Sequence, residues 1–271
     1  MIGQKQLLEA IDNLIEQQKF PRFAIICGLS GSGKKELCKY IAEKLNVFWC
    51  YEPDCKVETI RNAILDAYKV ASPTLYVFAD ADDMSIQAKN SLLKVTEEPP
   101  NNAYFIMTLE NINNTLPTIK SRATVFNMQD YTAPEILKYA EEKGVAEQDY
   151  SIISDICETP GEVNYVLTAG IKDFYGYVNK VMDNIAKVSG SNAFKIASNI
   201  CLKENNTGYD LKLFLKAFKT LCWRTYCDSK EVMYLKAINI TDQALRKCKS
   251  KSINKQMVFD IWLLAIREAW M

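Results

Sequence analysis

A glycine-rich stretch between two apolar segments is the first candidate for chemistry in this sequence. Residues 28–35 read GLSGSGKK; they follow the apolar run 23–27 and precede a segment with apolar residues at helical spacing. Glycines let the backbone curl so that several N–H groups point inward, and the start of a helix adds positive potential. A lysine after the last glycine can reach the β- and γ-phosphates of a nucleotide. The residues predicted to bind phosphate are Gly28, Ser30, Gly31, Ser32, Gly33, Lys34 and Lys35.

The position after this lysine departs from the phosphate-loop pattern. Serine or threonine is expected there because its hydroxyl holds Mg²⁺, but the sequence has Lys35. A second ammonium group can offset phosphate charge, whereas it cannot ligate magnesium. ATP or ADP is therefore an expected ligand, and magnesium is not expected to be held in the usual way.

A second departure follows the apolar run 75–79. The Walker B motif of AAA+ ATPases places an aspartate for Mg²⁺ and then a glutamate that activates water at the end of such a strand. Here these positions are Ala79 and Asp80, so the metal carboxylate is missing and a shorter acid occupies the base position. Phosphoryl transfer depends on positioning and on neutralisation of charge by metal, so hydrolysis is expected to be severely weakened. Asp80 remains a degenerate catalytic candidate; with Asp82 and Asp83 it forms either an ordinary acidic loop or a different metal site.

Composition excludes several other chemistries. Histidine is absent, which rules out Ser-His-Asp, Cys-His and HExxH sites. The nine cysteines are expected to be reduced thiols, because no secretory signal is present and neither Cys50 with Cys55 nor Cys222 with Cys227 has zinc-knuckle spacing. Lys and Arg number 33, as do Asp and Glu, so no overall field attracts nucleic acid or an anionic membrane. With no apolar run long enough for a membrane span, we expect a cytoplasmic protein without membrane contact.

Apolar runs alternate with helical segments in the first half of the chain. The runs predicted as strands are 23–27, 47–51, 75–79, 103–107 and 123–126. This alternation predicts a doubly wound α/β core, with a five-stranded parallel sheet flanked by helices. Beyond residue 129 only helical patterns remain. We therefore expect a nucleotide-binding-like core at 1–128, a small helical lid at 129–172 and an all-α C-terminal domain at 173–271.

Two longer motifs carry a resemblance to a known family. Residues 88–100, AKNSLLKVTEEPP, resemble the A-x-N-A-L-L-K-x-L-E-E-P-P stretch of clamp-loader AAA+ subunits. Residues 116–123, LPTIKSRA, resemble that family's L-P-T-I-x-S-R-C motif, with Ala123 in place of the cysteine. The resemblance covers residues 1–128 well and the helical remainder only by architecture.

The resemblance implies a role within an assembly. In the family, the C-terminal helical domain joins five subunits into a collar, and the arginine of the Ser-Arg-Cys motif reaches the ATP site of a neighbouring subunit. On this sequence that trans arginine finger is Arg122. The implied partners are other clamp-loader subunits in a hetero-pentamer, a sliding clamp and, through the assembly, primed DNA. The family's four-cysteine zinc module is reduced to Cys50 and Cys55, so no zinc is expected.

The pattern of departures is closest to the delta-prime subunit. Such subunits resemble the motor subunits but often lack working ATPase motifs while keeping the finger, and Glu162 and Asn164 stand where a sensor-two arginine is expected. The sequence thus predicts a structural subunit of a DNA polymerase holoenzyme with weak or no intrinsic ATPase activity. Two alternatives stay open: an active gamma/tau-like ATPase in which Asp80 and a neighbouring acid rebuild the metal site, and a non-replicative AAA+-like interaction module. A bacterial and a phage or mobile-element origin are both compatible with the sequence.

Overall fold

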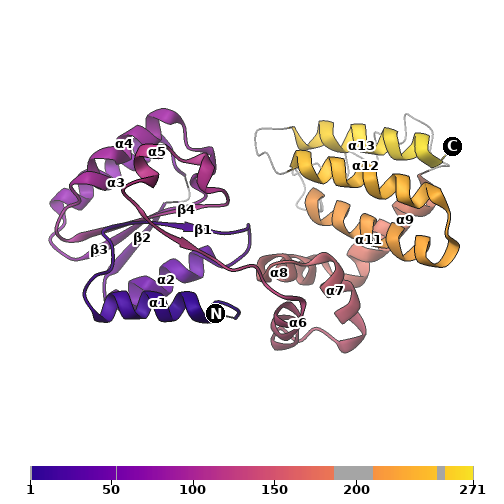
Figure 1. Cartoon of the computed structure of the whole chain (residues 1–271), viewed down its shortest axis with the longest axis horizontal. Helices are drawn as coiled ribbons and strands as arrows, with labels where there is room; N and C mark the ends of the chain where they lie inside the picture. Colours follow the sequence, from indigo (N-terminus) through magenta and orange to yellow (C-terminus); the bar gives the residue numbers. More distant parts are fainter. Residues whose placement is uncertain (1, 53, 186–209, 249–253, 271) are drawn as a thin grey trace. The chain divides into compact units, whose positions relative to one another are not determined.

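A computed structural model divides the chain into two compact units (Figure 1). It describes residues 2–52, 54–185, 210–248 and 254–270. The first unit comprises Met1–Glu135 with Thr159–Gly161, and the second comprises Ile136–Glu158 with Glu162–Met271. The division into a core, a lid and a C-terminal domain stays a prediction, and parts of 173–271 lie outside the described residues.

The first unit is built on the five-stranded parallel sheet that the sequence predicts. Its strand order is β2-β3-β4-β1-β5. Ile25 of β1 pairs with Met107 of β4 on one side and with Val125 of β5 on the other, and every neighbouring pair runs parallel. The carboxyl ends of β1, β3 and β4 therefore meet at one edge of the sheet. The strands are β1 (Phe23–Cys27), β2 (Phe48–Glu52), β3 (Thr74–Phe78), β4 (Ala103–Leu109) and β5 (Thr124–Asn127).

Helices cover both faces of this sheet (Figure 1). Because successive strand residues point to opposite faces, Ile25 joins one apolar core while Ala24 and Ile26 join the other. One face is covered by α1 (Lys5–Glu16) and α2 (Lys34–Leu45), and the other by α3 (Val57–Lys69), α4 (Ile86–Glu97) and the short α5 (Pro117–Lys120). With both faces buried, the strands read as nearly continuous apolar runs.

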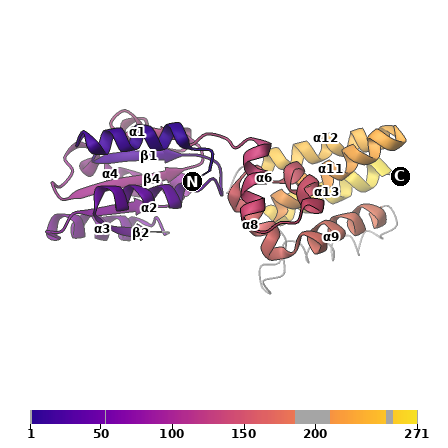
Figure 2. The same ribbon diagram turned by 90° about the horizontal axis from the view of Figure 1, so that it is seen from below.

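The rest of the described chain is helical. In it, α11 packs against α9 and α12, and α12 packs against α13 (Figure 2). An aromatic cluster fills this bundle: the Trp262 ring makes edge-to-face contacts with Phe214 and Phe218, and its indole N–H donates to the buried Thr241 hydroxyl at 3.0 Å. None of the described helices combines the length and apolar character that a membrane span needs. The helices are α6 (Ala133–Glu142), α7 (Tyr150–Ile156), α8 (Pro160–Ala169), α9 (Ile171–Asn184), α11 (Leu211–Ser229), α12 (Val232–Cys248) and α13 (Lys255–Trp270).

Candidate functional site

The glycine-rich loop joins β1 to α2, as its sequence predicts. Gly31 and Gly33 both have positive φ angles, +74° and +94°, a region in which side chains are strained. Gly33 precedes the first turn of α2, and Lys34 is the first residue of that helix. The loop thus has the strand, turn and helix start that a phosphate site requires.

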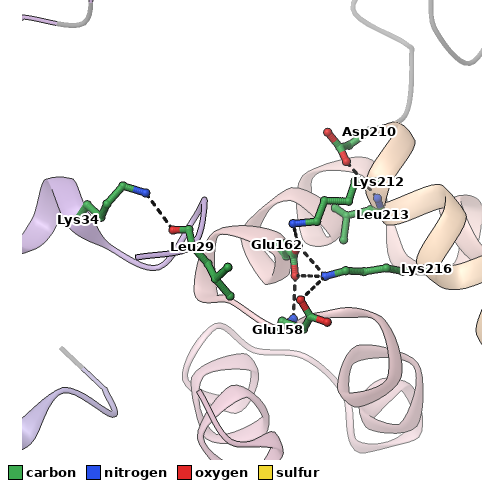
Figure 3. Close-up of polar contacts among 8 residues, drawn as sticks. All are labelled: Leu29, Lys34, Glu158, Glu162, Asp210, Lys212, Leu213 and Lys216. Atoms are coloured by element: carbon green, nitrogen blue, oxygen red, sulfur yellow. Dashed lines mark hydrogen bonds and ion pairs between the residues drawn. The ribbon is translucent and has the colours of Figure 1, made fainter. Parts of the chain in front are cut away.

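Lys34 is directed toward its own loop. Its ammonium group donates to the carbonyl oxygens of Gly28 at 2.9 Å and Leu29 at 3.0 Å, and the residue is only 7% exposed. Figure 3 shows the contact with Leu29. The N–H of Ser32 donates to the same Leu29 oxygen at 3.2 Å. Two donors that a phosphate would use therefore converge on one backbone carbonyl.

A second layer of contacts surrounds the loop. The carbonyl of Gly31 accepts a hydrogen bond of 2.9 Å from the N–H of Gly161, and the carbonyl of Ser32 accepts one of 2.6 Å from the Tyr131 hydroxyl. Gly161 and Thr159 belong to the first unit with the loop, although most of α8 belongs to the second. No sequence pattern indicates that Tyr131 contacts the loop. For Gly161 the only indication is the small-residue turn Thr159-Pro160-Gly161.

Lys35 replaces the magnesium-binding hydroxyl with a positive charge. Its side chain is exposed, and its ammonium lies 4.5 Å from the centroid of the Tyr51 ring at the end of β2. An exposed cation–π contact of this kind is worth about 0.5–1 kcal/mol. Burial, followed by the charge of Asp80, raises the pKa of Tyr51. Lys35, Tyr51 and the degenerate acid thus occupy one neighbourhood at the edge of the sheet.

The acidic loop after β3 has two exposed acids, Asp80 and Asp83, and one anchoring acid, Asp82. Asp80 is exposed with φ +46°, and its N–H donates to the Thr108 hydroxyl at 2.9 Å. Asp82 accepts the N–H groups of Glu110 at 2.8 Å and Asn111 at 3.1 Å, and the side-chain amide of Asn114 at 2.9 Å. Within the described ranges, no cluster of three or more Cys, Asp or Glu side chains could hold a metal ion. Asp82 therefore ties the loop after β3 to the loop after β4.

Arg122 lies outside this cluster of loops. It follows α5, and its guanidinium donates to the carbonyl of Thr118 at 3.0 Å and pairs with Glu97 at 3.0 Å. The side chains of Arg122 and Glu97 are 40% and 54% exposed. Both partners come from α4 and α5, and neither belongs to the phosphate loop, so the guanidinium is held on the surface by weak local contacts.

Glu162 pairs with a lysine within the second unit. The Lys216 ammonium on α11 contacts both carboxylate oxygens of Glu162, at 2.9 and 3.1 Å, and one of Glu158 at 2.8 Å (Figure 3). Burial alone would lower the pKa of Lys216, but the charge of Glu162 and hydrogen bonds to both acids raise it overall. The family resemblance implies a sensor-two arginine near this position. The chain instead has Glu162, whose carboxylate pairs with Lys216.

Known proteins share this sequence pattern and fold. A family model described as "DNA polymerase III, delta subunit" matches residues 51–132. DNA polymerase III subunit gamma of Buchnera aphidicola subsp. Schizaphis graminum is 27% identical over 191 residues, covering 57% of this chain and 53% of that protein. Subunit tau of Bacillus subtilis is 25% identical over 167 residues, covering 51% and 30%. This chain is related to the bacterial clamp-loader AAA+ subunits.

The solved structures support the fold. A DNA polymerase III gamma subunit-related protein of Thermotoga maritima aligns over 98% of this chain and 100% of its own, with 18% identity and a TM-score of 0.56. The RuvB Holliday junction branch migration motor of Thermotoga maritima aligns over 82% and 78%, with 14% identity and a TM-score of 0.53. At these identities the likeness establishes the AAA+ fold alone. The chain spans about half, or less, of the length of the curated relatives it matches.

Removal of the Asp82 carboxylate should destabilise the protein irrespective of magnesium. Asp82→Ala loses three hydrogen bonds to one carboxylate, so we expect the free energy of unfolding to fall by roughly 2 kcal/mol. Urea unfolding followed by circular dichroism measures this, in Mg²⁺ and in EDTA. The exposed Asp130→Ala is the matched control and should change little. A loss seen only in the presence of Mg²⁺ would show that Asp82 is a metal ligand instead.

Proposed function

We propose that this chain is a delta-prime-like clamp-loader subunit that acts structurally and supplies Arg122 to the ATP site of a neighbouring subunit. The observation that carries the proposal is the contrast between two sites on one fold. Its own phosphate loop has Lys35 and Ala79 where magnesium ligands are expected, while Arg122 stands on the surface within the family's Ser-Arg motif. Such a subunit needs no hydrolysis of its own.

The contacts of Arg122 suit a group that must change partners. An exposed ion pair contributes only about 0–1 kcal/mol, so release from Glu97 costs little. In a water-excluded site between subunits, the same guanidinium would meet the charge that develops on a transferred phosphoryl group. An arginine in that place contributes about 10³ to 10⁵ in rate.

The wider assembly follows from the same proposal. The chain would join other clamp-loader subunits in a hetero-pentamer, with 1–128 as the nucleotide-binding-like core, 129–172 as the lid and 173–271 as the collar domain. Through that assembly it would act on a sliding clamp and primed DNA in the cytoplasm. The nine cysteines would remain reduced, and no zinc would be bound.

An active gamma/tau-like subunit is the second candidate, favoured by the names of the curated relatives. It would require Asp80 and another acid to hold Mg²⁺. The geometry argues against this, because Asp80 is exposed on a left-handed turn and Asp82 is engaged by three N–H donors. A non-replicative interaction module is the third candidate, and failure to associate with any clamp-loader ATPase subunit would favour it.

Arg122→Ala should leave the assembly intact and remove turnover at one site. With ATPase subunits and DNA added, we expect the site that receives the finger to slow by about 10³-fold or more. Steady-state ATP turnover and size-exclusion chromatography are the measurements, and the exposed Lys120→Ala on the same segment is the control. Unchanged DNA-stimulated turnover by a complete Arg122→Ala assembly would refute the finger.

Glu97→Gln tests whether Glu97 restrains the finger. The substitution keeps side-chain length but removes the charge, so turnover by the assembly should stay the same or rise by up to about fivefold, the equivalent of one exposed ion pair. Combined with Arg122→Ala, it should add nothing, since both changes act through one guanidinium. A fall as deep as that of Arg122→Ala would mean that Glu97 positions the finger rather than restraining it.

Nucleotide binding should be indifferent to magnesium. ATP and ADP would bind as free anions, with Lys34 and Lys35 offsetting the phosphate charge, so calorimetric titrations with Mg²⁺ and with EDTA should give the same affinity. Lys34→Ala should weaken binding in both. The double variant Lys35→Thr with Ala79→Asp should gain magnesium dependence, because it restores both ligand types. Strong magnesium dependence in the unaltered protein would instead support the active-ATPase candidate.

A further inference from the structure

We propose that hydrogen bonds from Tyr131 and Gly161 hold the phosphate loop in a conformation in which its own carbonyl groups accept hydrogen bonds from Lys34 and Ser32. Breaking these two hydrogen bonds, which we call the lock, raises the affinity of the loop for nucleotide. The inference goes beyond the clamp-loader role, since it concerns what the isolated chain can bind. It rests on how the carbonyl groups of Leu29, Gly31 and Ser32 are held.

On the inner side of the loop, the Leu29 carbonyl takes the place of an anion oxygen. It accepts both the Lys34 ammonium at 3.0 Å and the Ser32 N–H at 3.2 Å. A phosphate group would compete for these same donors. Since a buried ammonium must keep its hydrogen bonds, the lysine leaves these carbonyls only if phosphate oxygens replace them.

On the outer side, Gly161 fixes the direction of that peptide. The carbonyl of Gly31 and the N–H of Ser32 belong to one planar trans peptide group, so they point in opposite directions. While Gly161 holds the Gly31 carbonyl, the Ser32 N–H is directed toward Leu29. The two hydrogen bonds therefore support each other.

Tyr131 fixes the next peptide group in the same way. Its hydroxyl donates to the carbonyl of Ser32 at 2.6 Å, which sets the direction of the N–H of Gly33. This N–H is another of the donors that line a phosphate loop. Two adjacent peptide groups of the loop are thus held by residues that lie far away in the sequence.

The approach of Gly161 is possible only because both partners lack side chains. A Cβ atom on Gly161 would lie 2.5 Å from the Cα of Gly31, and one on Gly31 would lie 2.7 Å from the hydroxyl of Thr159. Thr159 is 1% exposed, so the turn is closely packed where it meets the loop. A methyl group at 161 must therefore separate the turn from the loop.

Titration of the purified chain with ATP in EDTA tests the lock. Tyr131→Phe keeps the ring but loses the hydroxyl, and Gly161→Ala opens the contact with Gly31. We expect each to raise ATP affinity roughly 3- to 10-fold, the factor that corresponds to one net hydrogen bond. Gly176→Ala is the control: it is also a helical glycine, and among the described residues no atom beyond the neighbouring backbone of its own helix lies within 4 Å of the added methyl group.

Each other result counts against the lock. Weaker binding in Tyr131→Phe and Gly161→Ala would mean that these residues build the nucleotide site. Unchanged affinity, or no binding by any of the variants, would mean that the contacts do not govern binding. Tyr131→Phe decides the question if Gly161→Ala fails to fold. Because ATP turnover by the assembly and the Arg122 variants play no part here, the lock and the finger can fail separately.

Discussion

The parallel register of β1, β3 and β4 is the constraint on which the rest of the site depends. It brings the loops that follow these strands to one edge of the sheet, although they are separated by some 30 to 80 positions in sequence. The phosphate loop, the acidic loop and the loop before α5 can touch only because of this register. Asp82 then joins two of them with hydrogen bonds that neither loop could form alone.

The same edge carries groups other than the expected metal ligands. A hydrolase concentrates acids there because a metal ion neutralises them. In this chain, one acid position is Ala79, Asp82 is satisfied by N–H donors, and the cation is the side chain of Lys35 against Tyr51. Hydrogen bonds and a cation–π contact within the protein thus hold these side chains. The arrangement is consistent with a loop that serves packing at least as much as ligand binding.

Sequence alone predicted the strands and the loop because their signals are local. Five apolar runs gave five strands within about one or two residues of their ends, and GLSGSGKK gave the strand, loop and helix start around Lys34. The partners of the loop could not be found this way, since Tyr131 lies 99 residues from Ser32 and follows no spacing rule. The anchoring role of Asp82 could not be predicted either, because a metal ligand and an acceptor of N–H groups have the same sequence pattern, an acid after a strand. The roles of Asp80 and Arg122 remain predictions.

The two candidate sites are separable because different parts of the fold hold them. The phosphate loop depends on β1, the start of α2, Tyr131 and the turn at Gly161, whereas Arg122 depends on α5 and the end of α4. Losses in the first set therefore leave the second intact. In its proposed role, Arg122 needs only a rigid core, a surface position and partners that are easily exchanged. That proposed role requires neither Mg²⁺ ligands nor an open phosphate loop in this chain, provided the sheet keeps its register. The structure has that combination of features: a buried, satisfied Lys34 and an exposed, weakly held Arg122.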